Sequence, residues 1–176
     1  STPLTIEDYP SPNFDAREAG TPVDMLVIHY TGMLSGEEAL ARLTDIEWEV
    51  SAHYMIEEDG RVFRLVAEEH RAWHAGVSYW RVHRNINARS IGIELVNPGY
   101  DFGYRPFSEA QMRALEILAT DILSRYPISP RNVVGHSDIA PTRKNDPGEL
   151  FDWRSLADKG IGHWPERATH GPDNIM

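Results

Sequence analysis

Short apolar runs alternate with amphipathic segments along the chain, and this alternation predicts its secondary structure. Five segments have the length and the apolar content of β-strands: residues 25–30, 50–57, 61–66, 91–96 and 131–135. The second and third of these flank Glu58-Asp59-Gly60. An Asp-Gly turn between two strand-like segments is typical of a β-hairpin.

Two helices are predicted from their first turns. Ser35-Gly-Glu-Glu38 and Ser108-Glu-Ala-Gln111 each place a serine three residues before a Glu or Gln, the spacing of a capping box. After Ser108, apolar residues recur on one helical face until Pro127 ends the helix. These apolar residues are Met112, Leu115, Ala119 and Ile122. A short helix is also expected over residues 152–159.

Strands that alternate with helices, together with one hairpin, predict an α/β fold. We expect a single domain with a mixed central β-sheet flanked by helices, and a monomer. Residues 1–22 are rich in proline and are expected to form an irregular N-terminal arm. Residues 23–162 would then form the main domain and residues 163–176 a loose C-terminal tail. No run approaches the roughly 18 apolar residues of a membrane span, so none is expected.

The net charge of −10 argues against nucleic acid as a partner. The charge is uneven, however. Residues 1–60 hold 13 acidic residues against two arginines, whereas residues 61–90 hold six arginines against two glutamates. This local arginine excess either faces an anionic ligand or forms a solvated basic surface.

Two histidines and one aspartate are candidates for a metal site. His29 lies near the end of one predicted strand and His136 directly follows another, so both rings are expected at strand ends, where open sheets place their sites. Asp146 follows ten residues after His136, and the sequence contains no cysteine. Two imidazoles and a carboxylate suit zinc, and three protein ligands leave a fourth position for water, as in catalytic sites.

Two further charged residues are candidates for catalysis. Glu94 lies within an apolar strand, where a carboxylate either forms a structural salt bridge or serves as a general acid and base with a raised pKa. Lys144 precedes Asp146 by two residues, so in an extended segment both side chains point to the same side. It is then either a surface charge or a group that stabilises an oxyanion.

The chain resembles the zinc N-acetylmuramoyl-L-alanine amidases, most closely their AmpD-like branch, which is related to phage-type amidases and peptidoglycan recognition proteins. The resemblance covers roughly residues 23 to 156. It is carried by Val27-Ile-His-Tyr-Thr-Gly32, Val50-Ser-Ala-His-Tyr-Met-Ile56, Arg71-Ala-Trp-His-Ala-Gly76, Ser90-Ile-Gly-Ile-Glu94 and Gly135-His-Ser-Asp-Ile-Ala-Pro141. It implies one zinc ion per chain, a sheet of the peptidoglycan-recognition-protein type and a muropeptide substrate.

The resemblance also implies roles for particular residues. His29, His136 and Asp146 would hold the zinc ion, Glu94 would be the acid and base, and Lys144 would stabilise the oxyanion. Substrate-binding residues would be Trp73, His74, Asn87 and Arg143, although Asn87 serves equally well as a turn residue. Arg143 is expected on the opposite side of the segment from Lys144. Phage-type relatives use a tyrosine near the position of Ala52. Alanine cannot supply that hydroxyl group, so here the role of acid and base would fall to Glu94.

His53 is a rival to the metal ligands, but its place inside a strand favours the core or a supporting contact. The substrate is expected to be a soluble anhydro-muropeptide, cleaved during cell-wall recycling in the cytoplasm, because the sequence shows no wall-binding repeat and no basic surface suited to an anionic polymer. The alternatives are a periplasmic amidase for polymeric peptidoglycan, a non-catalytic peptidoglycan-binding module, and a zinc peptidase that cuts within the stem peptide.

Overall fold

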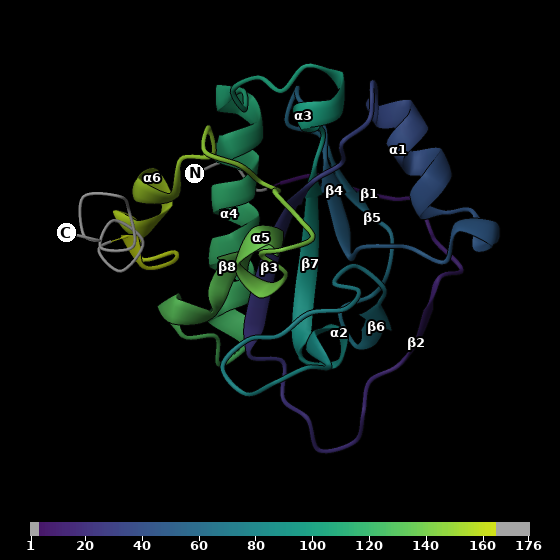
Figure 1. Cartoon of the computed structure of the whole chain (residues 1–176), viewed down its shortest axis with the longest axis vertical. Helices are drawn as coiled ribbons and strands as arrows, with labels where there is room; N and C mark the ends of the chain where they lie inside the picture. The colour runs from purple at the N-terminus through teal and green to yellow at the C-terminus, as the bar shows by residue number, and fades with distance from the viewer. Residues whose placement is uncertain (1–3, 165–176) are drawn as a thin grey trace.

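Six strands form a mixed sheet in the order β1-β5-β4-β7-β3-β8 in the computed structural model, which describes residues 4–164 (Figure 1). The strands are β1 (Ile6–Asp8), β3 (Met25–Tyr30), β4 (Tyr54–Ile56), β5 (Val62–Arg64), β7 (Ser90–Leu95) and β8 (Val133–Gly135). Strands β4, β7, β3 and β8 are mutually parallel, and β5 pairs antiparallel with β4. The predicted hairpin is therefore confirmed, as is the mixed α/β class.

The helices begin where the capping patterns predict. They are α1 (Gly36–Leu43), α2 (Ile86–Arg89), α3 (Gly99–Phe102), α4 (Glu109–Arg125), α5 (His136–Ile139) and α6 (Trp153–Ala157), with 3₁₀ turns η1 (Ile46–Trp48) and η2 (Pro130–Asn132). The Ser35 hydroxyl accepts the Glu38 N–H, and the Ser108 hydroxyl accepts the Gln111 N–H. The sequence did not predict α2, α3 and α5, which have four residues each.

The two faces of the sheet differ, because side chains of a strand alternate between faces. Leu26 and Ile28 of β3 belong to the core that the sheet forms with α4, and Met25 and Val27 belong to a cluster with residues of α2 and α5. In β7 the residues packed with α4 are Ile91, Ile93 and Leu95. Ser90, Gly92 and Glu94 alternate with them, so these three face the side that carries α1, α2 and α5.

The expectation of an irregular arm over residues 1–22 is wrong for two segments. Strand β1 pairs parallel with β5 at the edge of the main sheet, and β2 (Phe14–Ala16) pairs antiparallel with β6 (His70–Ala72) in a second, two-stranded sheet. Arg17 then donates side-chain hydrogen bonds to four backbone carbonyls, those of Glu68, Asn87, Ala88 and Ser90. These pairings involve residues far along the chain, so the local pattern did not reveal them.

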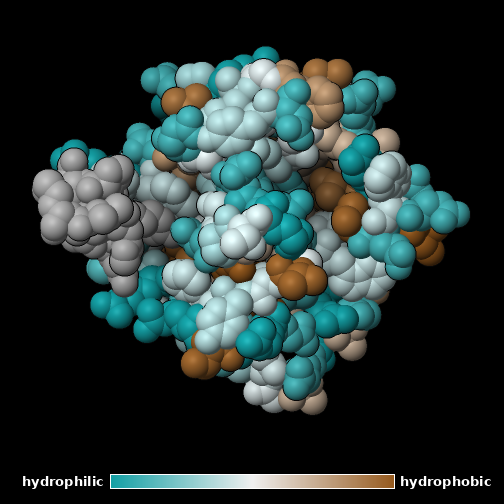
Figure 2. All heavy atoms as spheres, viewed as in Figure 1, coloured by the Kyte–Doolittle hydropathy of each residue, from teal (hydrophilic) through white to brown (hydrophobic). Residues whose placement is uncertain are grey.

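The tail expected over residues 163–176 lies outside the described residues beyond Trp164. The face seen in Figure 2 is mostly hydrophilic, with hydrophobic residues in small separate patches. Within residues 4–164, no helix combines the length and the hydropathy that a membrane crossing requires.

Candidate metal centre and active site

The candidate ligands lie where the parallel strands end. His29 is the penultimate residue of β3 and is paired in register with Glu94 of β7, so both side chains point to the same face. Ile28 of β3 is paired with Gly135 of β8, and the next residue, His136, opens α5. Neighbouring parallel strands therefore bring His29, Glu94 and His136 together at one edge of the sheet, the edge formed by the C-terminal ends of these strands.

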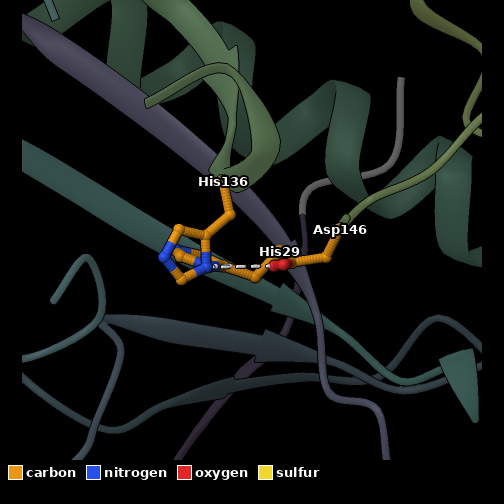
Figure 3. A group of neighbouring side chains, drawn as sticks. All are labelled: His29, His136 and Asp146. Carbon is orange, nitrogen blue, oxygen red and sulfur yellow. Dashed lines mark hydrogen bonds and ion pairs between the residues drawn. The ribbon is translucent and has the colours of Figure 1, made fainter. Parts of the chain in front are cut away.

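Three ligand atoms converge at this edge (Figure 3). The Nδ1 atoms of His29 and His136 are 3.0 Å apart, and Asp146 Oδ2 lies 3.2 Å from the first and 3.3 Å from the second. Two atoms about 2.0–2.1 Å from a zinc ion and separated by a tetrahedral angle lie about 3.3–3.4 Å from each other. The spacing of the three atoms therefore fits one tetrahedral zinc ion.

The donor chemistry fits the same ion. The second ring nitrogen of His136, Nε2, lies 2.9 Å from the Ala75 carbonyl oxygen and must donate to it, which leaves Nδ1 of a neutral ring as a lone pair. That lone pair faces the Asp146 carboxylate, which also offers only lone pairs when ionised. Burial acts to raise the pKa of Asp146, but the contacts with His136 and His29 outweigh it and hold this pKa well below its usual range. A buried group of acceptors is the environment that a cation requires.

Main-chain and tyrosine contacts hold the segment that carries Asp146. The Ser137 N–H donates to the Asp146 carbonyl oxygen at 2.9 Å and so ties the segments of two ligands together. The Tyr104 hydroxyl donates to the Pro147 carbonyl oxygen and accepts the Leu150 N–H. No sequence pattern indicated this role for Tyr104.

Glu94 stands beside the three ligand atoms, with its Oε2 4.0 Å from His29 Nδ1. Burial raises the pKa of Glu94 well above its ordinary value, the Asp146 carboxylate raises it further, and Lys144 partly offsets the effect. The nearest charged partners of this carboxyl belong to the site itself. Among the described residues, Glu94 thus lies beside the candidate metal ligands rather than in a separate salt bridge.

A cavity of about 440 Å³, here called the site cavity, opens over these residues. Its lining includes the three ligands, Glu94, Trp73 and three cationic side chains, those of Arg42, Arg143 and Lys144. Lys144 is half-buried and lines the same cavity as Glu94 and Asp146. It therefore faces the candidate metal site as the sequence predicted, even though the chain from Pro141 to Arg143 turns instead of running extended.

The expected position of Arg143 is wrong, because the turn brings it to the same cavity as Lys144. Its guanidinium donates to the carbonyl oxygens of Ala75 and Val77 and so holds the loop that follows Trp73. Asn87 also holds that loop, since its side-chain oxygen accepts hydrogen bonds from the N–H groups of His74 and Ala75. Asn87 is not part of the cavity lining among the described residues, so the structure gives it a positioning contact instead of a place against a ligand.

His74 also differs from the expectation of a direct substrate contact. It lines the site cavity but is buried, and both ring nitrogens are engaged within the protein. Its Nδ1 lies 3.0 Å from His29 Nε2, and its Nε2 lies 3.0 Å from the Ser90 hydroxyl oxygen. Burial lowers the pKa of His74 well below its ordinary value, with further lowering from His29 and other neighbours. His53, the rival ligand, is fully buried and bonds to the Gly92 N–H and the His70 carbonyl, as the sequence favoured.

The arginine excess of residues 61–90 does not face this site. Four of its six members pair with aspartates: Arg61 with Asp59, Arg64 with Asp8, Arg71 with Asp15, and Arg89 with Asp24. Within residues 4–164 none of the six lines the site cavity, whose cations come from other parts of the chain. The interpretation that this stretch faces a ligand is therefore wrong for the site cavity.

The family model described as N-acetylmuramoyl-L-alanine amidase matches residues 19–149, which include all three candidate metal ligands. The chain belongs to the N-acetylmuramoyl-L-alanine amidase family. This confirms the family resemblance seen in the sequence.

Two curated members of the family illustrate the similarity. The N-acetylmuramoyl-L-alanine amidase AmiD of Escherichia coli strain K12 is 46% identical over 179 residues, which cover 89% of this chain and 64% of AmiD. The 1,6-anhydro-N-acetylmuramyl-L-alanine amidase AmpD of Haemophilus influenzae is 36% identical over 161 residues, which cover 81% of this chain and 85% of AmpD. This chain thus spans less than two thirds of the length of AmiD.

Solved structures of the family share the fold. The E. coli AmiD complex with the substrate anhydro-N-acetylmuramic acid-L-Ala-D-gamma-Glu-L-Lys matches with a TM-score of 0.77 and 46% identity, over 84% of this chain and 61% of that chain. A selenomethionine derivative of AmpD matches with a TM-score of 0.77 and 32% identity, over 90% of this chain and 94% of that chain. The Clostridium intestinale amidase LysC, 21% identical with a TM-score of 0.66, covers 92% of this chain and 100% of its own and shares the fold alone.

Proposed function

We propose that this protein is a zinc-dependent amidase that hydrolyses the bond between a muramoyl lactyl group and the L-alanine of its stem peptide. The observation that carries the proposal is the triangle of His29 Nδ1, His136 Nδ1 and Asp146 Oδ2, with edges of 3.0 to 3.3 Å and the Glu94 carboxyl beside it. Three ligands and an adjacent buried carboxyl are the groups that metal-assisted amide hydrolysis requires.

Zinc at such a site supplies Lewis acidity and lowers the pKa of water toward about 7. Glu94 accepts a proton from the attacking water at its carboxylate and returns it to the nitrogen of the leaving amine. Burial raises the pKa of Glu94 well above its ordinary value, which makes its carboxylate a stronger base toward the proton of the water. Lys144 places its ammonium at the cavity wall, where it stabilises the negative charge that develops on the carbonyl oxygen.

The substrate we propose is a soluble anhydro-muropeptide. The AmiD structure holds an anhydromuramoyl tripeptide as substrate, and the AmpD enzymes are named for 1,6-anhydro-N-acetylmuramyl-L-alanine. Muropeptides carry several carboxylates, and the site cavity offers Arg42, Arg143 and Lys144 as cations. Trp73, which also lines the cavity, provides a flat apolar surface for a sugar ring.

The proposal is tested by kcat/KM on purified anhydro-muropeptide against peptide release from insoluble sacculi, each at two salt concentrations, with mass spectrometry of the products. We expect the soluble fragment to be cleaved faster, because the net charge of −10 repels anionic wall polymer, most strongly at low salt. Equal or faster release from sacculi at low salt favours the alternative, an amidase for polymeric peptidoglycan. A cut within the stem peptide identifies a peptidase, and absence of product from both substrates identifies a binding module.

Metal analysis tests the site independently of the substrate. We expect close to one zinc ion per chain, and a strong loss of zinc in His136→Ala. A His136→Ala variant that keeps both its zinc and its activity contradicts the ligand set. We further propose a monomer that acts in the cytoplasm, with the periplasm as the alternative. Light scattering and fractionation of cells that produce the natural protein test these two points.

A further inference from the structure

A row of hydrogen bonds leads away from His29 on the side opposite the candidate metal. His29 Nε2 lies 3.0 Å from His74 Nδ1, His74 Nε2 lies 3.0 Å from the Ser90 hydroxyl oxygen, and that hydroxyl lies 2.7 Å from the Ile86 carbonyl oxygen. His29, His74 and Ser90 are 1%, 7% and 0% exposed. The row is therefore shielded from water and ends on the main chain.

The direction of every hydrogen bond in this row follows from its last member. A carbonyl oxygen only accepts, so the Ser90 hydroxyl donates to Ile86 and its oxygen accepts from His74 Nε2–H. In a neutral ring, a proton on Nε2 leaves Nδ1 as a lone pair, and His74 Nδ1 must then accept from His29 Nε2–H. His29 Nδ1 is left as a lone pair, and it points at His136 Nδ1 and Asp146.

We propose that Ser90 and His74 are positioning residues that set the tautomer of His29, so that its Nδ1 presents a lone pair to the metal. The opposite direction would require Ser90 to donate to His74 and to give up its bond to the Ile86 carbonyl. It would also put a proton on His29 Nδ1, where the metal must bind. A hydrogen bond on the far ring nitrogen is the way in which proteins orient metal-binding histidines.

Gly92 leaves the space that the His74 ring occupies in this row of hydrogen bonds. A Cβ atom at this position would lie 2.5 Å from His74 Cγ and 2.7 Å from two other ring atoms. One face of β7 carries Ser90, Gly92 and Glu94 at alternate positions. Ser90 is the last side chain of the row of hydrogen bonds, Gly92 leaves space for the His74 ring, and Glu94 is the proposed acid and base. This accounts for the Ser-x-Gly-x-Glu pattern of the strand by one physical arrangement.

The inference rests on the proposed zinc site but not on the identity of the substrate, so it is tested by zinc affinity, measured by competition with a chelator. His74→Leu removes the atom that accepts the hydrogen bond from His29. The asparagine of His74→Asn is close in size to that leucine, but its side-chain oxygen lies near the position of Nδ1 and still accepts this hydrogen bond. We expect zinc affinity to fall about 10- to 100-fold in His74→Leu and to recover most of that loss in His74→Asn. A merely structural role would make both variants weaken alike.

Ser90→Ala should weaken zinc binding about tenfold, because the His74 proton loses its acceptor. Ser11→Ala is the matched control, since the Ser11 hydroxyl is also buried, donates to a carbonyl (Leu43) and accepts one N–H (Asn13). We expect its zinc affinity to stay within about threefold of wild type, since Ser11 has no contact in the row. Nitrogen NMR of the zinc-loaded wild type should show His74 protonated at Nε2.

Three results would each overturn the inference. They are a His74→Leu variant that binds zinc as tightly as wild type, equal losses in His74→Leu and His74→Asn, and a His74 ring protonated at Nδ1. A wild-type protein that binds no zinc would overturn both this inference and the proposed metal site. Zinc binding without amidase activity would overturn the proposed function alone.

Discussion

His53 predicts a measurable pH dependence of stability. Its ring is fully buried, and its Nδ1 accepts the Gly92 N–H while its Nε2 donates to the His70 carbonyl at 2.8 Å. A second proton would have to go on Nδ1, against the Gly92 donor, with the Arg17 guanidinium 3.1 Å from the other ring nitrogen. Burial lowers the pKa of His53 from 6.5 to about 3, the charge of Arg17 contributes, and the bond to His70 opposes the shift.

The sign of the effect follows from which state binds the proton. Because the folded pKa lies below the unfolded value of 6.5, the unfolded chain gains the proton first as the pH falls. The stability contributed by neutral His53 is thus present above pH 6.5 and is lost between that pH and about 3. With these two pKa values, the free energy of unfolding falls by about 2 kcal/mol between pH 7 and pH 5 from this residue alone.

The assay compares wild type with His53→Gln, which has one acceptor and one donor but does not titrate. Urea unfolding of both proteins at the same two pH values gives a double difference, in which contributions from the remaining histidines cancel. We expect wild type to lose about 2 kcal/mol more than the variant. Equal losses, within about 0.5 kcal/mol, would refute the argument, as would a His53 ring whose NMR signals titrate with a midpoint above about pH 5.5.

Further predictions concern catalysis and packing. Glu94→Ala should keep its zinc and lose about 10²- to 10⁴-fold in kcat, and Lys144→Ala about 10²-fold or more. Steady-state kinetics with zinc content as the control measures both, and a Glu94→Ala variant within about threefold of wild type would return Glu94 to a structural role. Gln111→Leu should lower the free energy of unfolding by about 1–3 kcal/mol, because its buried side-chain amide donates to two backbone carbonyls. Urea unfolding at pH 7 measures this, and an unchanged midpoint would contradict it.

The sequence determined the elements whose cause is local. A capping serine, a helical apolar stripe and Pro127 set the limits of α4, because each acts within a few residues of itself. The sequence also placed His29 and His136 at strand ends, since a short apolar run followed by a polar residue already marks where a buried strand stops. The candidate metal set followed from residue chemistry once the strands were placed.

Only the tertiary structure decided how distant segments neutralise and support one another. The arginine excess of residues 61–90 looked like a ligand surface until the fold brought Asp8, Asp15 and Asp24 against it. His74 looked like a substrate residue until β3 and β7 placed its ring between His29 and Ser90. The strands of the N-terminal arm were missed for the same reason. Pairing partners some 56 residues apart, such as Asp15 and Arg71, leave no periodic trace in either segment.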